Sequence, residues 1–132
     1  MANPNIVNVT TIYGTTTYYT PTGTTAVVLL NNTASSGKVY KINQIVAANV
    51  NGSTAVNATV SLYSNGAQSQ GSAPSGGTAY PIVSTVSVPA NASLVAVDKT
   101  TAIYLMEGQS ISVTSGTASG ITYSISYEDI SS

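Results

Sequence analysis

The stretch Lys38–Val50, KVYKINQIVAANV, decides the fold, together with the stretch Ala55–Ser64, AVNATVSLYS, that follows it. Apolar and polar side chains alternate along both stretches, which is the period of a β-strand with one buried face. The dipeptide Asn51-Gly52 between them is typical of a tight hairpin turn. The pattern predicts a paired hairpin whose buried face carries Tyr40, Ile42, Val46, Ala48, Val50, Val56, Ala58, Val60 and Leu62 and whose polar face carries Lys41, Asn43 and Asn49.

Shorter strand-like runs lie on both sides of this pair, separated by Gly, Asn, Ser and Pro. Val, Ile and Thr together number 44 of the 132 residues, whereas Leu, Met, Glu, Lys, Gln and Arg number 16, which disfavours helices. The last run alternates most cleanly, with Ile121, Tyr123, Ile125 and Tyr127 on one face. The remaining predicted strands are Ile6–Ile12, Thr24–Leu30, Tyr80–Val88, Leu94–Val97, Ala102–Met106 and Ser110–Val113.

Two segments between these runs are predicted to be loops. Gly14–Gly23, GTTTYYTPTG, is expected to be a polar and aromatic connection, and Asn65–Ala79, NGAQSQGSAPSGGTA, a solvated, mobile loop. The whole pattern predicts an all-β fold, a single-domain antiparallel β-sandwich over residues 1–132, jelly-roll or Greek-key like, with about eight or nine strands. Residues 1–12 are expected to form an N-terminal arm or an edge strand.

The residue types that are missing exclude much chemistry. The chain has no His, Cys or Arg, its cations are Lys38, Lys41 and Lys99, and its formal net charge is −1. These absences remove Ser-His-Asp triads, thiolate and imidazole metal sites and the bidentate Arg clamp for phosphate. We therefore expect no catalytic residues, no cofactor, no metal site and no nucleic-acid partner. The chain has no run of about 20 apolar residues and no N-terminal secretion signal, so no membrane partner and no export are expected.

The nine tyrosines are the main candidates for contacts. Tyr40, Tyr123 and Tyr127 have inward or interfacial strand parity, so we expect them to pack in the core with a hydrated hydroxyl. Other tyrosines lie in or beside the connection Gly14–Gly23, where they have no evident core role, and aromatic residues are enriched at protein interfaces. With the apolar N-terminal run, they give the candidate interface residues Tyr13, Tyr18, Tyr19, Ile6, Val7 and Val9.

Several stretches resemble those of a known family in their strand pattern and turn residues. They are Gly37–Val50, Ala58–Tyr63 (ATVSLY), Pro89–Val95 (PANASLV), Ile103–Val113 (IYLMEGQSISV) and Ser126–Ile130 (SYEDI). In this order they resemble the small virion structural proteins of tailed phages, particularly those that infect marine cyanobacteria. The resemblance implies a β-sandwich carried in many copies on the particle, as a capsid decoration protein, a neck or tail component or a fibre-associated module.

We therefore expect a non-enzymatic virion structural protein that is assembled in the host cytoplasm. The leading hypothesis is a capsid decoration or cement protein that binds the outer capsid surface. Its expected partners are the major capsid protein or other virion proteins, and further copies of itself, with a trimer as the expected oligomer. The low charge and the alternating strand pattern favour contacts made by apolar and hydroxyl-rich surfaces and by strand edges.

Two other function classes stay open. The alternative is a tail, neck or fibre component that binds a receptor or a carbohydrate through the candidate tyrosines and the loop Asn65–Ala79. A third hypothesis is a hydrolase that gathers Asp98, Glu107 or Lys99 with a serine in one cleft. The simpler interpretation of these charged residues is surface charge at strand ends.

Overall fold

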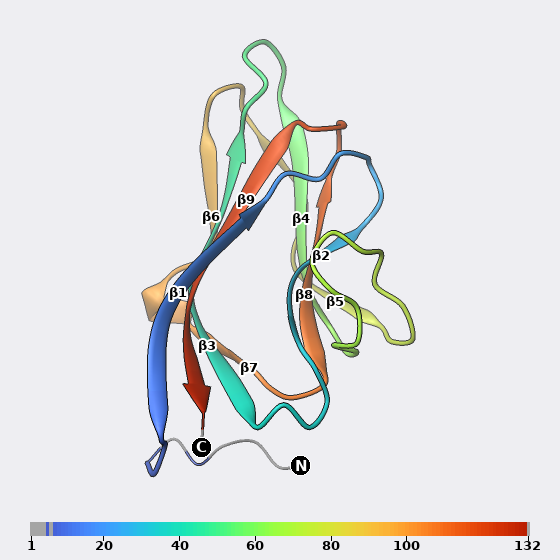
Figure 1. The fold of residues 1–132 in the computed structure, drawn as a ribbon. Helices are drawn as coiled ribbons and strands as arrows, with labels where there is room; N and C mark the ends of the chain where they lie inside the picture. Colours follow the sequence, from blue (N-terminus) through green and yellow to red (C-terminus); the bar gives the residue numbers. More distant parts are fainter. Residues whose placement is uncertain (1–4, 6, 132) are drawn as a thin grey trace.

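Two antiparallel sheets pack face to face in the computed structural model, which describes Asn5 and residues 7–131 (Figure 1). A 3-10 helix, η1 (Lys99–Thr101), follows β6 (Ser93–Val97). The predicted all-β sandwich is confirmed, with nine strands among these residues. Sheet A contains β1 (Thr11–Tyr19), β3 (Lys38–Asn49), β6 (Ser93–Val97), β7 (Ile103–Leu105) and β9 (Ile121–Ser131), and sheet B contains β2 (Val27–Asn32), β4 (Val56–Tyr63), β5 (Ala79–Val88) and β8 (Gln109–Ser115).

The strand order is that of a jelly roll. Sheet A is ordered β1-β9-β3-β6, with β7 also paired to β3, and sheet B is ordered β2-β8-β4-β5. Since β6 and β7 pair with the same strand, they together occupy one edge position, and each sheet has four positions. This arrangement leaves four edges: β1 and the β6/β7 pair in sheet A, and β2 and β5 in sheet B.

The predicted hairpin across Asn51-Gly52 is wrong. β3 lies in sheet A and β4 lies in sheet B, so the two strands face each other across the core and share no ladder. The connection spans residues 50–55, and Asn51 Oδ1 accepts main-chain N–H bonds from Ser53 and Thr54 (2.9 and 3.2 Å), which holds a wider turn. Alternation identifies the buried face of a strand, and a buried face fits an arch between sheets as well as a hairpin.

A bulge changes the inward face of β3 along its length. The register of β3 against β9 shifts between Ile42 and Gln44. Ile42 is buried as predicted, but beyond the bulge the core positions belong to Ile45 and Ala47. The predicted inward positions Val46, Ala48 and Val50 are therefore wrong, and Val50 is 56% exposed.

Asn49 was expected on the polar face of β3, and this prediction is also wrong because of the same shift. Its side chain is buried, and Nδ2 donates hydrogen bonds to the carbonyl oxygens of Thr54 and Val88 (3.0 and 2.9 Å). Its Oδ1 accepts the main-chain N–H of Asn51 (2.8 Å). Asn49 therefore satisfies main-chain groups where β3 leaves the sheet, which makes its burial favourable.

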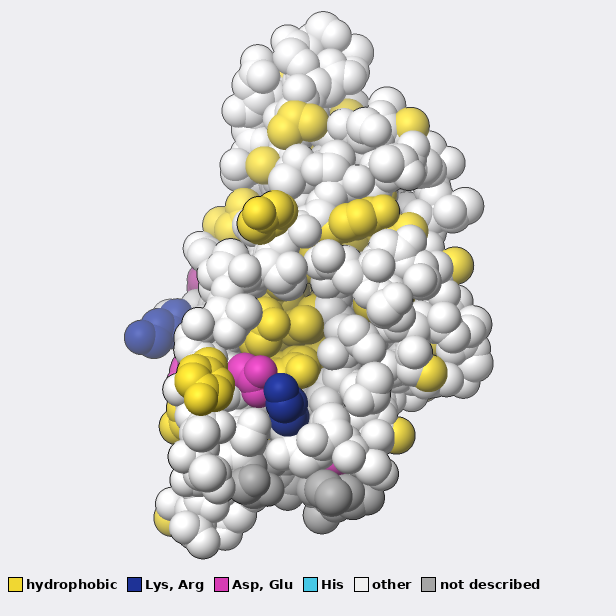
Figure 2. All heavy atoms as spheres, viewed as in Figure 1, with side chains coloured by type: hydrophobic (Ala, Val, Ile, Leu, Met, Phe, Trp, Pro, Cys, Tyr) yellow, Lys and Arg dark blue, Asp and Glu magenta, His cyan; other side chains and the backbone are white. Residues whose placement is uncertain are grey.

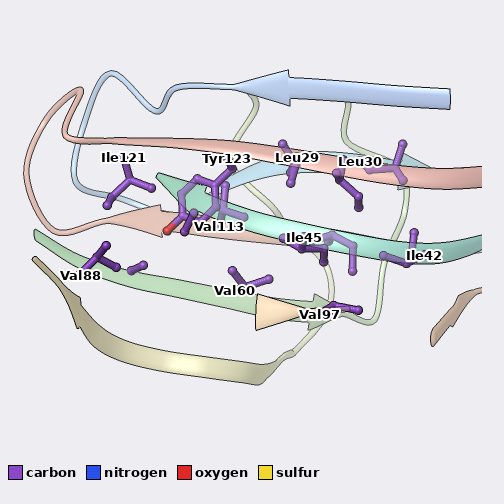
Figure 3. Close-up of a cluster of buried hydrophobic side chains, with 14 of the residues drawn as sticks. Leu29, Leu30, Ile42, Ile45, Val60, Val88, Val97, Val113, Ile121 and Tyr123 are labelled. Carbon is purple, nitrogen blue, oxygen red and sulfur yellow. The ribbon is translucent and has the colours of Figure 1, made fainter. Parts of the chain in front are cut away.

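The core lies between the two sheets and consists mainly of aliphatic side chains, which Figure 3 shows pointing into that space. Tyr123 of β9 is fully buried among them, so its predicted packing role is confirmed. Its hydroxyl is not hydrated as expected, because it donates to the carbonyl of Thr114 and accepts the N–H of Thr59 (3.2 Å). Burial raises the pKa of Tyr123 to about 12. This one side chain ties sheet A to two strands of sheet B.

The prediction for the N-terminal third is wrong in its strand boundaries. Of the predicted strand Ile6–Ile12, Ile6 lies outside the described residues, and residues 7–10 do not belong to a strand. β1 begins only at Thr11 and continues to Tyr19, through most of the segment Gly14–Gly23 that was expected to be a connection. It pairs with β9 along its whole length. The β-branched threonines and the tyrosines of this segment suit a pleated strand.

The segment between β4 and β5 folds back onto sheet B, and we call it the covering loop (residues 64–78). Val28 of β2 donates its N–H to the carbonyl of Ser72 (2.9 Å), and Gly71 donates its N–H to the carbonyl of Val28 (2.9 Å). Ser110 Oγ of β8 donates to the carbonyl of Asn65 (2.8 Å). The prediction of a solvated, mobile loop misses these bonds, which cover the edge of β2.

Candidate interaction surface

The three candidate tyrosines lie on β1, and the strand directs them to two different faces. Tyr13 and Tyr19 lie directly opposite Asp129 and Tyr123 of β9, on the side of sheet A that faces sheet B. Tyr18 belongs to the outward face and is 71% exposed. Tyr19 packs against the core, whereas Tyr13 is mostly exposed at the other end of the strand. The three rings therefore do not form one aromatic cluster.

The aliphatic candidates precede β1. Val7 is 91% exposed and Val9 is half-buried, while Ile6 lies outside the described residues. Sequence reasoning did not include Ile12 among the candidates, although it lies on the outward face of β1 with 53% of its surface exposed. Ile12 and Tyr18 are thus the two exposed hydrophobic side chains of the outward face of β1.

The free side of β1 is an exposed strand edge. None of the described strands pairs with it, since β9 occupies the other side. The nine residues of β1, TIYGTTTYY, contain no charged residue and no proline. Proteins normally prevent unwanted pairing at such an edge by shortening it, bending it, charging it or covering it. β1 is long, uncharged and unbroken in register, and the contacts of the covering loop with it lie near its C-terminal end, at Thr17 and Tyr19.

The other three edges are protected, each in a different way. The covering loop occupies the edge of β2. β5 contains Pro81, and its register against β4 shifts twice. The remaining edge of sheet A is divided into β6, with five residues, and β7, with three, by η1 and the charged pair Asp98 and Lys99. β1 is therefore the one described edge that is available to another chain.

The outward face of sheet A continues from this edge and is rich in hydroxyls and small apolar side chains. Thr16 Oγ1 and Ser126 Oγ are hydrogen-bonded across β1 and β9 (3.0 Å). The charges Lys41 and Glu128 lie directly opposite each other on β3 and β9. Figure 2, which shows the molecule from the side of β1 and β2, has few charged side chains. The apolar side chains that the register places on the outward face include Ile12, Tyr18, Val46, Ala48, Val95 and Tyr104.

The inward side of sheet A carries a small polar group near the start of β3. Lys38 Nζ lies 3.2 Å from Asp129 Oδ2, and the rings of Tyr40 and Tyr127 are 5.0 Å apart. Burial raises the pKa of Tyr127, and the neighbouring Tyr40 and Asp129 raise it further. Figure 2 shows an acidic side chain beside a lysine and next to hydrophobic side chains on the side between β1 and β2. Both tyrosines remain protonated at neutral pH, so neither phenol acts as a base there.

The structure does not gather the residues of the hydrolase hypothesis. Asp98 caps η1, and hydrogen bonds from Thr100 lower the pKa of its carboxyl group. Glu107 lies beyond the other end of β7, where its Oε2 accepts the N–H of Gly37 (2.8 Å). Lys99 is exposed in η1. Within residues 5 and 7–131, no three carboxylates or other metal-binding side chains are grouped, and no helix is long and apolar enough to span a bilayer.

Comparisons with known proteins give no relative. No protein-family model, no curated protein and no solved structure matches the chain significantly. The resemblance of Gly37–Val50 and the later stretches to phage virion proteins therefore stays a prediction, as do the candidate interface residues. The function has to be inferred from the surface of the molecule.

Proposed function

We propose that this chain is a non-enzymatic structural subunit of a virion, namely a capsid decoration protein that binds the outer capsid surface. The observation that carries the proposal is the exposed, uncharged nine-residue edge of β1. A strand edge binds by main-chain hydrogen bonds, and flanking side chains give the contact its specificity. A subunit that works in this way needs a rigid sandwich and no reactive group.

The composition supports the same proposal. Charged residues are 5% of the chain, and the absence of His, Cys and Arg leaves few groups that could perform catalysis. Contacts made by such a surface depend on apolar burial and on neutral hydrogen bonds, which salt screens only weakly. A jelly roll is also a common fold of viral capsid proteins, although the fold alone does not assign a function.

The copy number of the chain in purified particles tests the proposal. Quantitative mass spectrometry of particles from an infected host is expected to find the chain in hundreds of copies, as decoration of a capsid surface requires. Binding to the particles is expected to survive a rise in salt from about 50 to about 500 mM, because the contacts are not electrostatic. A few copies, complete absence from particles, or release at high salt would each contradict a decoration protein.

A receptor- or carbohydrate-binding component of the tail or fibre is the second candidate. One observation favours it: Gln70 of the covering loop donates from Nε2 to Thr17 Oγ1 of β1 (3.2 Å), so the loop lies beside the strand that carries the candidate tyrosines. Jelly rolls include lectin domains as well as capsid proteins. A glycan array and a host-cell binding assay separate the two proposals, because a decoration protein is expected to bind neither glycans nor cells.

A further inference from the structure

We propose that β1 pairs in antiparallel fashion with β1 of a second copy of this chain, so that two sheets A join into one continuous sheet across a two-fold axis at Thr15. The inference rests on the proposed function and deepens it, because it assigns the exposed edge to the contact between neighbouring subunits on the particle and not to the capsid surface itself. The reason for this pairing is the unequal protection of the four edges. β2 is covered, β5 is shifted in register and β6/β7 is interrupted, whereas β1 is continuous in register and uncharged.

The absence of charge makes β1 suited to its own copy. A two-fold axis places identical residues near each other, so a charged residue near the axis meets a like charge. β1 has no charged residue, and the charged residues directly opposite it on its neighbour β9 are Glu128 and Asp129, which face Gly14 and Tyr13. Lys38 pairs with Asp129, and Asn43 Nδ2 donates to Glu128 Oε2 (3.0 Å), so both carboxylates have partners within their own copy.

One register pairs all nine residues of β1, and it is self-complementary. In it, Thr15 lies opposite Thr15 of the second copy, and Thr11 lies opposite Tyr19. Ile12 then lies opposite Tyr18 of the second copy, and the symmetry repeats this contact at the other end. These are the exposed hydrophobic side chains of the outward face, 53% and 71% accessible, and an aliphatic side chain opposite an aromatic one is a favourable cross-strand pair.

The other two pairs of this register lie one on each face of sheet A. The register places Tyr13 opposite Thr17 of the second copy, and Gly14 opposite Thr16. A Cβ built on Gly14 has no neighbour within 4 Å, so the main chain is open at this position. The covering loop contacts the C-terminal end of β1 through Gln70, which bonds Thr17 Oγ1, and through Gly71, which packs against Tyr19, and among the described residues no main-chain hydrogen bond joins the loop to β1.

The contact is an edge about 30 Å long with two hydrophobic pairs, which is smaller than a standard interface. We therefore expect a reversible dimer whose population rises with concentration. When many copies are held on one particle, the high local concentration favours the same contact without any new residue.

Sedimentation equilibrium of the full chain over a series of concentrations tests the pairing. The wild-type chain is expected to fit a monomer–dimer equilibrium, and Thr15→Lys is expected to weaken it about tenfold or more, since two like charges meet at the axis. Ser87→Lys, at an exposed position of the protected edge β5, adds the same charge and is expected to leave the dimer unchanged. A mixture of Thr15→Lys and Thr15→Glu is expected to restore dimers.

The absence of native cysteine allows an independent test of the register. Opposed residues of an antiparallel pair have Cα atoms about 4.5–5.5 Å apart, within the range that a disulfide spans. Under mild oxidation, Thr15→Cys is expected to give a covalent dimer, and Ser87→Cys is expected to stay monomeric. Circular dichroism of each variant confirms that it is folded before association is measured.

Three results would overturn the inference: a wild-type chain that stays monomeric at every concentration, a trimer that Thr15→Lys does not affect, or a dimer in which Thr15→Cys forms no crosslink. Each refers to the isolated chain and leaves the proposed function to the particle experiment. A monomer found in hundreds of copies per particle refutes only the pairing, and a β1-linked dimer that is absent from particles refutes only the decoration function.

Discussion

The two edges of sheet A differ in almost every property that controls strand pairing. β1 is a continuous strand of nine uncharged residues, whereas the opposite edge is divided into β6 and β7 by η1. At the division, Asp98 and Lys99 place two charges in an exposed turn. Both edges belong to one sheet and share one core, so we interpret the difference as one of access to partners. It indicates that the β6/β7 edge is closed to partners and that the β1 edge is open.

The same contrast exists between the sheets, because β2 is covered where β1 is not. The covering loop depends on Gly66, whose backbone passes against β2 and β8. A Cβ at this position would collide with the carbonyl of Asn32 and lie 2.5 Å from the carbonyl of Gln109. Both are main-chain atoms of strands, so displacing them costs free energy.

Gly66→Ala is therefore expected to have the largest effect, a loss of about 2 kcal/mol in the free energy of unfolding. The covering loop should separate from β2, and the amide of Val28, which bonds Ser72, should exchange its hydrogen faster. Urea unfolding and amide exchange measure the two effects. Gly23→Ala is the control, since a Cβ at Gly23 meets nothing within 4 Å. If Gly66→Ala and Gly23→Ala had the same free energy of unfolding, the close packing of the covering loop on β2 would not contribute to stability.

A smaller effect is expected at Tyr123, which joins the two sheets beneath both edges. Tyr123→Phe removes the bonds of the hydroxyl to Thr114 and Thr59 and should lower the free energy of unfolding by about 1 kcal/mol. The folded-state pKa, raised to about 12, exceeds the ordinary value of 10.0. The neutral hydroxyl therefore contributes stability that is complete below pH 10 and is lost as the pH rises toward 12, because the unfolded chain releases the proton first.

Urea unfolding at a series of alkaline pH values tests this behaviour. Tyr123→Phe should reduce the alkaline loss of stability relative to the wild type, while Tyr18→Phe, at an exposed ring, should leave it unchanged. The amides of β1 and β2 should be destabilised together, because one core supports both edges. An unchanged alkaline slope in Tyr123→Phe would contradict the assignment of this proton to the core tyrosine.

The sequence predicted the fold well where the signal was local. Alternation on β9 identified Ile121, Tyr123, Ile125 and Tyr127 as the inward set, and turn residues marked most strand ends. It failed where the answer depended on distant residues. Alternation could not tell that Lys38–Asn49 pairs with β9 rather than with its neighbour in sequence, nor that a bulge near Ile42 reverses the inward face.

The candidate surface was predicted only in part, for a related reason. The tyrosines of β1 are predicted contact residues, but the pattern is interpreted as a connection where the structure has a strand, because Thr, Tyr and Gly occur in both. Whether a strand is an edge is decided by what lies beside it, and no local pattern contains that information. The repeated β-branched residues Thr15, Thr16 and Thr17 were the signal that could have indicated a strand.

The smallest effect is expected at the protected edge, where Asp98 caps η1. The hydroxyl of Thr100 donates to its Oδ1, as do the N–H groups of Thr100 and Thr101 (2.9 and 3.2 Å), and these bonds lower the pKa of the carboxyl from its ordinary value. The carboxylate thus contributes its bonds fully above the ordinary pKa, and they are lost as the pH falls through the lowered value. Asp98→Ala should speed amide exchange at Thr100 and Thr101, as acid should in the wild type, and leave global unfolding nearly unchanged, because the turn is exposed.

Lys99→Ala is the matched control in the same turn and should leave these amides unaffected. A global loss comparable to that of Gly66→Ala would show that this turn supports the core, and the contrast between the two edges of sheet A would then reflect stability and not partner access.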